Sequence, residues 1–271
     1  TSKVTDMTGT FGWTPFLTDI GDLSKWDTSN VTSMAEMFGD TGLTNIGALS
    51  KWDTSNVTNM ANMFQDTKFT NIGDLSKWNT AKVTDMSLMF SKASKLTNIG
   101  DLGQWDTHNV TNMRNMFNQA SNLTNIGDLS NWNTDKVTDV SYMFNDNEAL
   151  RNLNISNWNL SNLTNDESNK KSLEYIFAND NNLTVIANNI TLPTWYQNEV
   201  NDADYFWNNH IAVITNVPEL IKATGDIDNL KIDDQDASRS IFYDSKGSND
   251  AIKVLTDANN QYIADYHKAN P

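Results

Sequence analysis

The chain has 271 residues, no cysteine and a formal net charge of −15 at pH 7. The lack of cysteine excludes a disulfide framework, and the negative charge argues against nucleic acid or an anionic membrane as a partner. No apolar run approaches the length of a membrane span, and no signal peptide is recognisable. The length suffices for one extended domain and a smaller second module.

A motif recurs every 26 or 27 residues through residues 1–187, and the copy at residues 52–64 reads WDTSNVTNMANMF. Its tryptophans mark the period: Trp26, Trp52, Trp78, Trp105, Trp132 and Trp158. A unit of this size cannot bury its own apolar face, whereas stacked copies can. The sequence therefore predicts an α/β repeat solenoid of about seven units, the first of them truncated.

Each unit contains two segments with different apolar spacing. The segment LTNIGALSKW at residues 43–52 spaces its apolar side chains as a buried strand would, and the additional Gly47 predicts a bulge. In VTNMANMF at residues 57–64, the apolar side chains lie on one side of a short helix. Helices need more room than strands, so we expect a curved rod with a parallel sheet on its concave side and helices on the other.

The tryptophan and methionine columns invite functional interpretations. Tryptophan rings could stack on sugars, but each one is in phase with buried Leu and Ile, which predicts a core ladder whose indole N–H binds a turn carbonyl. Methionine sulfur could bind a soft metal. All ten methionines lie in the predicted helices beside Phe, however, and this pattern favours core packing.

The strand positions that are not needed for the core would form a polar, acidic strip on the concave face. Adjacent carboxylates would lie about 5 Å apart and repel one another. Neighbouring lysines on a solvated face, bound Ca²⁺ at Asp74, Asp101 and Asp128, or a basic partner could offset that repulsion. The candidate binding residues of the strip are Asn45, Ser50, Asn71, Asp74, Ser76, Asn98, Asp101, Asn125 and Asp128.

The repeat pattern stops near residue 188. We expect residues 188–271 to form a C-terminal capping region that is rich in β-structure, with HIAVITNV at residues 210–217 as one strand. An aromatic group precedes that strand and could either cover the last unit or contact a partner. Its candidate binding residues are Trp195, Tyr196, Tyr205 and Trp207.

The repeated pattern L-x-x-L-x-L/I-S-x-W-D/N-T-x-x-V-T-x-M-x-x-M-F resembles the BspA-like leucine-rich repeat family. That family comprises surface proteins of lactic-acid bacteria, mycoplasmas and related anaerobes, and the resemblance covers about residues 1–187. It implies a cell-surface or secreted bacterial protein with an adhesive role, and it implies no catalytic residues. The departures are the additional Gly in most strands, Val140 in place of Met, and a displaced helix start at residues 165–172.

A catalytic site needs an acid and a base in different environments. The aspartates here repeat with nearly identical neighbours, and His108, His210 and His267 lie far apart without a motif around them. We expect a non-enzymatic adhesin fragment, monomeric, that binds a host or microbial surface protein, mucin or glycan, with its export signal and wall anchor outside this sequence. The alternatives are a passive structural stalk and a polysaccharide-acting enzyme.

Overall fold

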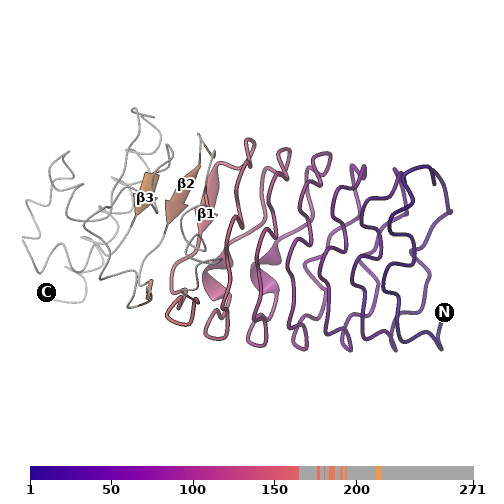
Figure 1. The fold of residues 1–271 in the computed structure, drawn as a ribbon, viewed down its shortest axis with the longest axis horizontal. Coiled ribbons are helices and arrows are strands. Elements are labelled where there is room, and N and C mark those ends of the chain that lie inside the picture. Colours follow the sequence, from indigo (N-terminus) through magenta and orange to yellow (C-terminus); the bar gives the residue numbers. More distant parts are fainter. Residues whose placement is uncertain are drawn as a thin grey trace, which may run out of the picture.

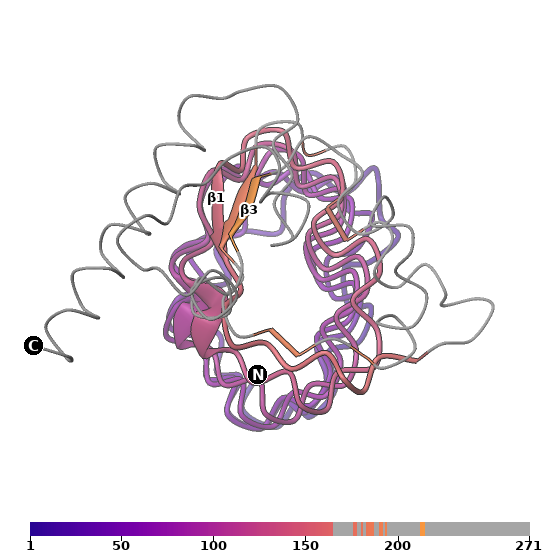
Figure 2. The same cartoon turned by 90° about the vertical axis from the view of Figure 1, so that its left-hand side faces the viewer.

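The computed structural model describes residues 1–164, 176–177, 180, 183–186, 190–191, 193 and 212–214. The chain winds in successive turns, which we call coils, stacked along one axis with the N-terminus at one end (Figure 1). Seen along that axis, the coils superpose around one common interior (Figure 2). Each coil therefore contacts the coils before and after it in the sequence.

Backbone hydrogen bonds join each coil to the next. A row of parallel bridges runs from Asp6 and Ser33 to Asn112 and Asp139. Around one of these bridges, the N–H groups of Met60, Asn62 and Phe64 donate to carbonyls of the following coil at 3.0, 2.8 and 2.9 Å. Alternate residues thus bond across coils as they would in a parallel sheet.

The same segments were expected to be short helices, and that prediction is wrong within the described residues, where they form turns. Between the bonds that cross to the next coil, Met63 donates to Met60 and Gln65 donates to Asn62, three residues back. Asn62 and Asp66 adopt left-handed backbone with φ of 59° and 48°. A helix would send each N–H four residues back. Here alternate N–H groups bond to the neighbouring coil, and consecutive tight turns produce the three-residue spacing of methionines.

The regular elements are few and short: η1 Leu102–Gln104, η2 Leu129–Asn131, β1 Asn152–Asn154, β2 Thr184–Ile186 and β3 Ala212–Ile214. The three strands form a parallel sheet in the order β1-β2-β3. Of the strands that the sequence predicted, the one in the last repeat (β1) and the one at residues 210–217 (β3) are confirmed, whereas the one at residues 43–52 does not form. In earlier coils Gly47 and its equivalents interrupt the extended backbone with positive φ, between 78° and 91°. One hydrogen bond still joins these segments across coils, as from Leu49 to Ile72 at 2.8 Å.

The interior is filled by columns of identical side chains. Trp105 stacks on Trp78 and Trp132 with centroid separations of 6.4 and 6.5 Å and interplanar angles of 4° and 2°. Its indole N–H donates to the carbonyl of Leu75 at 3.0 Å. The methionine column is equally buried, as at Met113. The core prediction for tryptophan and for methionine is therefore confirmed.

Three larger expectations stay predictions. These are the curvature of the rod, its assignment to the leucine-rich repeat class, and a domain boundary between residues 1–187 and residues 188–271. Within the part of the chain that the structure describes, no helix is long and apolar enough to cross a membrane.

Candidate binding surfaces

The structure brings together the predicted strip residues. Leu75 donates its N–H to the Ile99 carbonyl at 2.8 Å, and Leu102 donates to Ile126 at 2.9 Å, so equivalent segments of adjacent coils lie side by side. The predicted Asn and Asp side chains flank these bonds and are exposed, while Ser50 and Ser76 are half-buried. The strip is therefore a continuous polar surface along several coils.

Each asparagine of the strip has a local structural role. Its side-chain oxygen accepts a hydrogen bond from the backbone N–H of the glycine two residues later, as Asn71 does from Gly73 at 2.7 Å and Asn98 from Gly100 at 2.9 Å. Asn45 and Asn125 make the same bond. Such turns fix the side-chain oxygen against the backbone, so the amide nitrogen is the group that points away from this bond.

The aspartates of the strip are held in the same way. Asp74 accepts a hydrogen bond from the backbone N–H of Ser76 at 2.8 Å. Asp101 caps η1 by accepting from the backbone N–H of Gly103, and Asp128 caps η2 by accepting from that of Ser130. The hydrogen bonds from Ser76, first from its backbone and then from its hydroxyl, lower the pKa of Asp74, and the charge of Lys77 adds to this effect. The carboxylate therefore remains ionised to acidic pH and presents a fixed negative charge.

Glycines on each following coil make room for these carboxylates. A Cβ at Gly100 would collide with the Asp74 carboxylate, and one at Gly127 would collide with that of Asp101. The additional glycine in these copies therefore has two functions, since it supplies positive φ and receives the aspartate of the preceding coil. At Asp128 the next coil offers Asn154 instead, whose amide donates to the carboxylate at 3.1 Å.

Calcium binding and the aromatic group are the remaining site predictions. No cluster of three or more His, Asp or Glu side chains within the described ranges is arranged to hold a metal ion, and the calcium hypothesis at Asp74, Asp101 and Asp128 stays a prediction. Trp195, Tyr196, Tyr205 and Trp207 lie outside the described residues.

A second surface, which the sequence analysis did not single out, runs along another side of the coils. We call it the ridge, and its members all stand two residues after the buried Phe column and have positive φ. They are Trp13, Asp40, Asp66, Lys92, Gln119 and Asp146. The ridge position carries Trp, Lys and Gln as well as Asp, whereas the Phe two residues earlier is the same in every copy.

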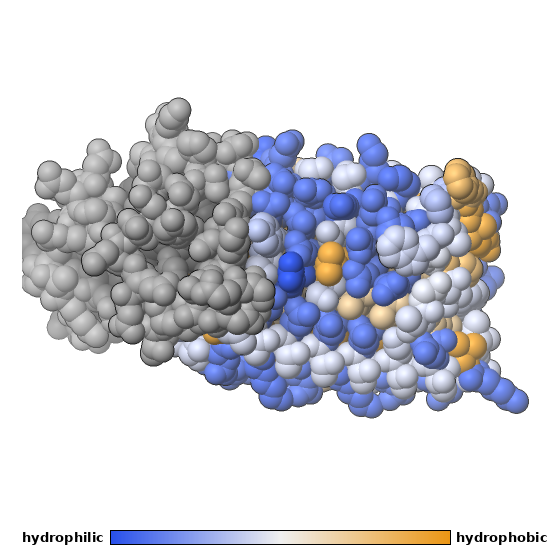
Figure 3. Space-filling view, in the orientation of Figure 1, coloured by the Kyte–Doolittle hydropathy of each residue, from blue (hydrophilic) through white to orange (hydrophobic). Residues whose placement is uncertain are grey.

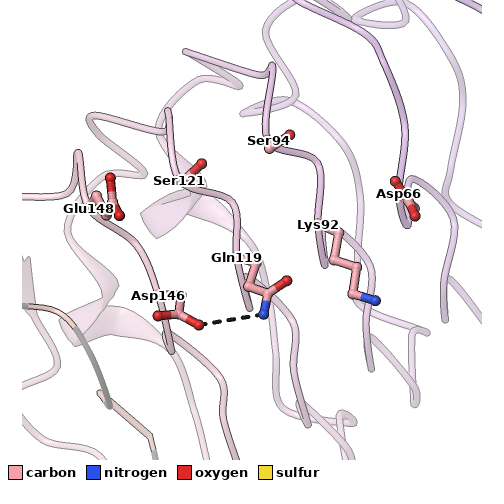
Figure 4. A pocket seen from close by; sticks show the side chains of 7 residues that line it. All are labelled: Asp66, Lys92, Ser94, Gln119, Ser121, Asp146 and Glu148. Carbon is pink, nitrogen blue, oxygen red and sulfur yellow. Dashed lines mark hydrogen bonds between the residues drawn. The ribbon is translucent and has the colours of Figure 1, made fainter.

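A surface hollow of about 340 Å³ opens beside the C-terminal half of the ridge. Figure 4 shows one row formed by the ridge residues Asp66, Lys92, Gln119 and Asp146, and a second row formed by Ser94, Ser121 and Glu148. Each member of the second row stands two residues after a ridge residue. Gln119 donates to Asp146 across adjacent coils at 3.4 Å. The hollow thus presents hydroxyl, amide, ammonium and carboxylate groups together.

The N-terminal half of the ridge is dominated by acidic side chains. Asp66 lies 3.4 Å from the ammonium of Lys68, with both side chains well exposed to solvent. Burial and then the negative charge of Asp66 raise the pKa of Asp40, although Lys92 and Lys68 act in the opposite direction. Two carboxylates therefore stand close enough on adjacent coils to repel each other.

Comparison with known proteins found a family match and no relatives. No match was found among curated proteins or among solved structures. The family described as "Mycoplasma protein of unknown function, DUF285" matches residues 1–98, 69–185 and 95–219. Because these matches together span well over half of the sequence, the chain belongs to the DUF285 family.

Proposed function

We propose that this chain is a non-catalytic adhesion module of a bacterial cell surface, and that it binds a host or environmental protein, mucin or glycan through the polar strip. The observation that carries the proposal is the alignment of exposed Asn and Asp side chains on adjacent coils, each fixed by its own backbone. Fixed groups lose little conformational entropy on binding. Membership of the DUF285 family supports the proposal, because it agrees with the resemblance of the repeats to BspA-like surface proteins.

Stacked coils suit such a role because they present many equivalent groups along one direction. An extended partner, such as a glycan chain or a peptide segment, could contact several coils at once. Weak contacts at several linked sites combine into strong overall binding.

The proposal is tested by measuring binding of the full chain to immobilised mucin, matrix proteins and bacterial polysaccharides at low and high salt, with EDTA or with Ca²⁺. We expect saturable binding to one of these, weakened at least fivefold by the double substitution Asp74→Asn and Asp101→Asn. Asparagine retains the acceptor for the turn, so the change removes charge and leaves the fold intact. High salt should weaken binding of a basic protein and leave binding of a neutral glycan unchanged.

The matched control is the double substitution Asp27→Asn and Asp53→Asn. It removes the same charge at a column where other coils already carry asparagine, as at Asn79. Equal loss of binding in both double variants would attribute the effect to net charge and contradict the role of the strip. Absence of binding to every surface would favour the passive stalk.

A further inference from the structure

Two aromatic side chains stand in solvent at the N-terminal end of the ridge. Trp13 is 69% exposed and Phe16 is 95% exposed, whereas the Trp and Phe columns of the inner coils are buried. Apolar surface also gathers at this end of the molecule in Figure 3. Large exposed apolar groups are unfavourable in water unless something covers them, and they often mark interaction sites.

The loop that carries these side chains is held firmly against the second coil. Trp13 donates its N–H to the Gly39 carbonyl at 2.8 Å, and Gly42 donates to Thr14 at 3.0 Å. A Cβ at Gly42 would collide with the carbonyl of Pro15. At the equivalent position other coils carry residues with side chains: Lys68, Ser94, Ser121 and Glu148. The glycine thus allows this one loop to lie close and to direct its aromatic groups outward.

The backbone at Trp13 has the conformation that all ridge positions share. Its φ of 56° is left-handed, a conformation that bulky residues rarely adopt and that Asn and Asp tolerate well. Three later coils place Asp at this ridge position: Asp40, Asp66 and Asp146. An exposed tryptophan therefore occupies a site where aspartate or asparagine would be easier to accommodate.

One carboxylate contacts the exposed ring, and others follow along the ridge. Glu36 accepts a hydrogen bond from the indole N–H of Trp13 at 3.2 Å. Asp40 occupies the next position along the ridge, with Asp66 beyond it, and Lys92 and Lys68 offset only part of the repulsion between these two. The chain as a whole carries a net charge of −15. An aromatic face with flanking carboxylates is complementary to a cation.

We propose that Trp13, Phe16, Glu36 and Asp40 form a docking site for an arginine side chain of a basic partner protein. The guanidinium plane can lie on the indole while its N–H groups reach the carboxylates, which a lysine ammonium does less well. Phe16 would cover the aliphatic part of the same side chain. A neutral sugar could also stack on Trp13, but it would gain nothing from the negative charge. This inference goes beyond the proposed function, because it adds a second site on the ridge for a basic partner and leaves the strip as the proposed adhesion surface.

The test is a titration of the full chain with an acetylated and amidated hexa-arginine peptide at 50 mM NaCl, followed by calorimetry and by the indole N–H resonances in NMR spectra. Binding should shift the Trp13 resonance, which is identified by its loss in Trp13→Asn. We expect Trp13→Asn to weaken binding about fivefold and Asp40→Asn about threefold. Hexa-lysine should bind more weakly than hexa-arginine.

Other acidic groups also attract this peptide, so the matched control Asp53→Asn is needed. It removes one charge half a coil away along the chain, at the column where asparagine recurs, and should change affinity less than 1.5-fold. Asparagine favours left-handed backbone, so Trp13→Asn should melt at the temperature of the wild type or above it. If it does not fold, Trp13→Phe keeps an aromatic ring and should weaken binding about twofold.

Unchanged affinity in Trp13→Asn would overturn the proposal, and so would equal losses in Asp40→Asn and Asp53→Asn. A neutral oligosaccharide that shifts the Trp13 resonance while hexa-arginine does not would overturn it in favour of a sugar site. The substitutions Asp74→Asn and Asp101→Asn distinguish this site from the strip. If this double variant loses adhesion while hexa-arginine still shifts its Trp13 resonance, the strip and the Trp13 site are separate. If the wild type adheres but hexa-arginine does not shift the Trp13 resonance, only the strip remains as a binding site.

Discussion

The buried tryptophan column and the ridge respond differently to repetition. The column carries the same residue in every coil from Trp26 to Trp158, whereas the ridge carries Trp, Asp, Lys and Gln. In the column each side chain packs against the same side chain of the adjacent coil, so a substitution in one coil disturbs the packing with its neighbours. On the ridge each side chain faces solvent or a partner. Variation between copies of a repeat therefore indicates where a stacked protein is free to specialise.

The largest expected effect comes from breaking the column in its middle. Trp105→Ala removes two ring stacks and the indole hydrogen bond to Leu75. Truncation of a buried tryptophan costs about 3 to 5 kcal/mol, and we expect a loss of that order in the free energy of unfolding, measured with urea. A loss below about 1 kcal/mol would show that the column is not the main source of stability.

One buried position varies between coils, so it departs from the contrast between a constant interior and a variable ridge. We expect a pH effect of intermediate size there. Asp180 stands where earlier coils carry Thr41, Thr67 or Asn147. Its Oδ1 accepts from the Asn147 backbone N–H, while its Oδ2 is buried without a hydrogen-bond partner. Burial, supported by the charge of Asp146, raises the pKa of Asp180 from 3.8 to about 8, and the Asn147 hydrogen bond opposes that rise.

The folded state therefore holds a proton on Asp180 that the unfolded state releases above a pH of about 4. The contribution of Asp180 to stability should be greatest below that pH and should decline as pH rises towards 8, because charging the group in the folded state is costly. Asp180→Asn should remove this decline and stabilise the chain at pH 8 by on the order of 1 to 3 kcal/mol. Thermal unfolding followed by near-ultraviolet circular dichroism at several pH values measures both.

The control for this prediction is Asp53→Asn. Hydrogen bonds from the Ser55 hydroxyl and then from its backbone N–H lower the pKa of Asp53, so its titration falls below the window of interest. This variant should retain the wild-type decline between pH 4 and 8. An identical pH profile for Asp180→Asn and the wild type would contradict the account of Asp180.

The smallest effect is expected on the ridge. Lys92 is exposed, and the next coil carries Gln119 at the same position. Lys92→Gln should change the free energy of unfolding by less than about 0.5 kcal/mol, as exposed substitutions usually do. A cost above about 1 kcal/mol would mean that the ridge also contributes to packing between coils, and that its variation is constrained.

The sequence allowed the period, the buried columns and two strands to be predicted, because these depend on which side chains are apolar and how they are spaced. It misled at VTNMANMF, where a three-residue apolar spacing suggested a helix. Spacing alone cannot show whether an N–H bonds within its own turn or across to a neighbouring coil. The asparagine at position 62 and the aspartate at position 66 were a usable signal, since both tolerate the left-handed backbone found there.

The candidate site was predictable only in part. Columns such as Asn71, Asn98 and Asn125 could be aligned from the period, and the structure places them side by side. Their turn-forming bonds could be inferred from residue type, but the fit of Asp101 against Gly127 could not, because it depends on the distance between coils. Trp13 was not predicted, because the other copies carry Asp, Lys or Gln at its position and the prediction rested on residues that recur.

The hydrogen bonds between coils join each coil to its immediate neighbours, and this arrangement also determines how the molecule would respond to force. A pull along the chain at one end of the stack loads the bonds of the outermost coil first, and those of the next coil only after it has detached. Each detachment would release about 26 residues, or roughly 90 Å of extended chain. A tether of this construction would lengthen in steps, and the coils that remain would keep their surfaces.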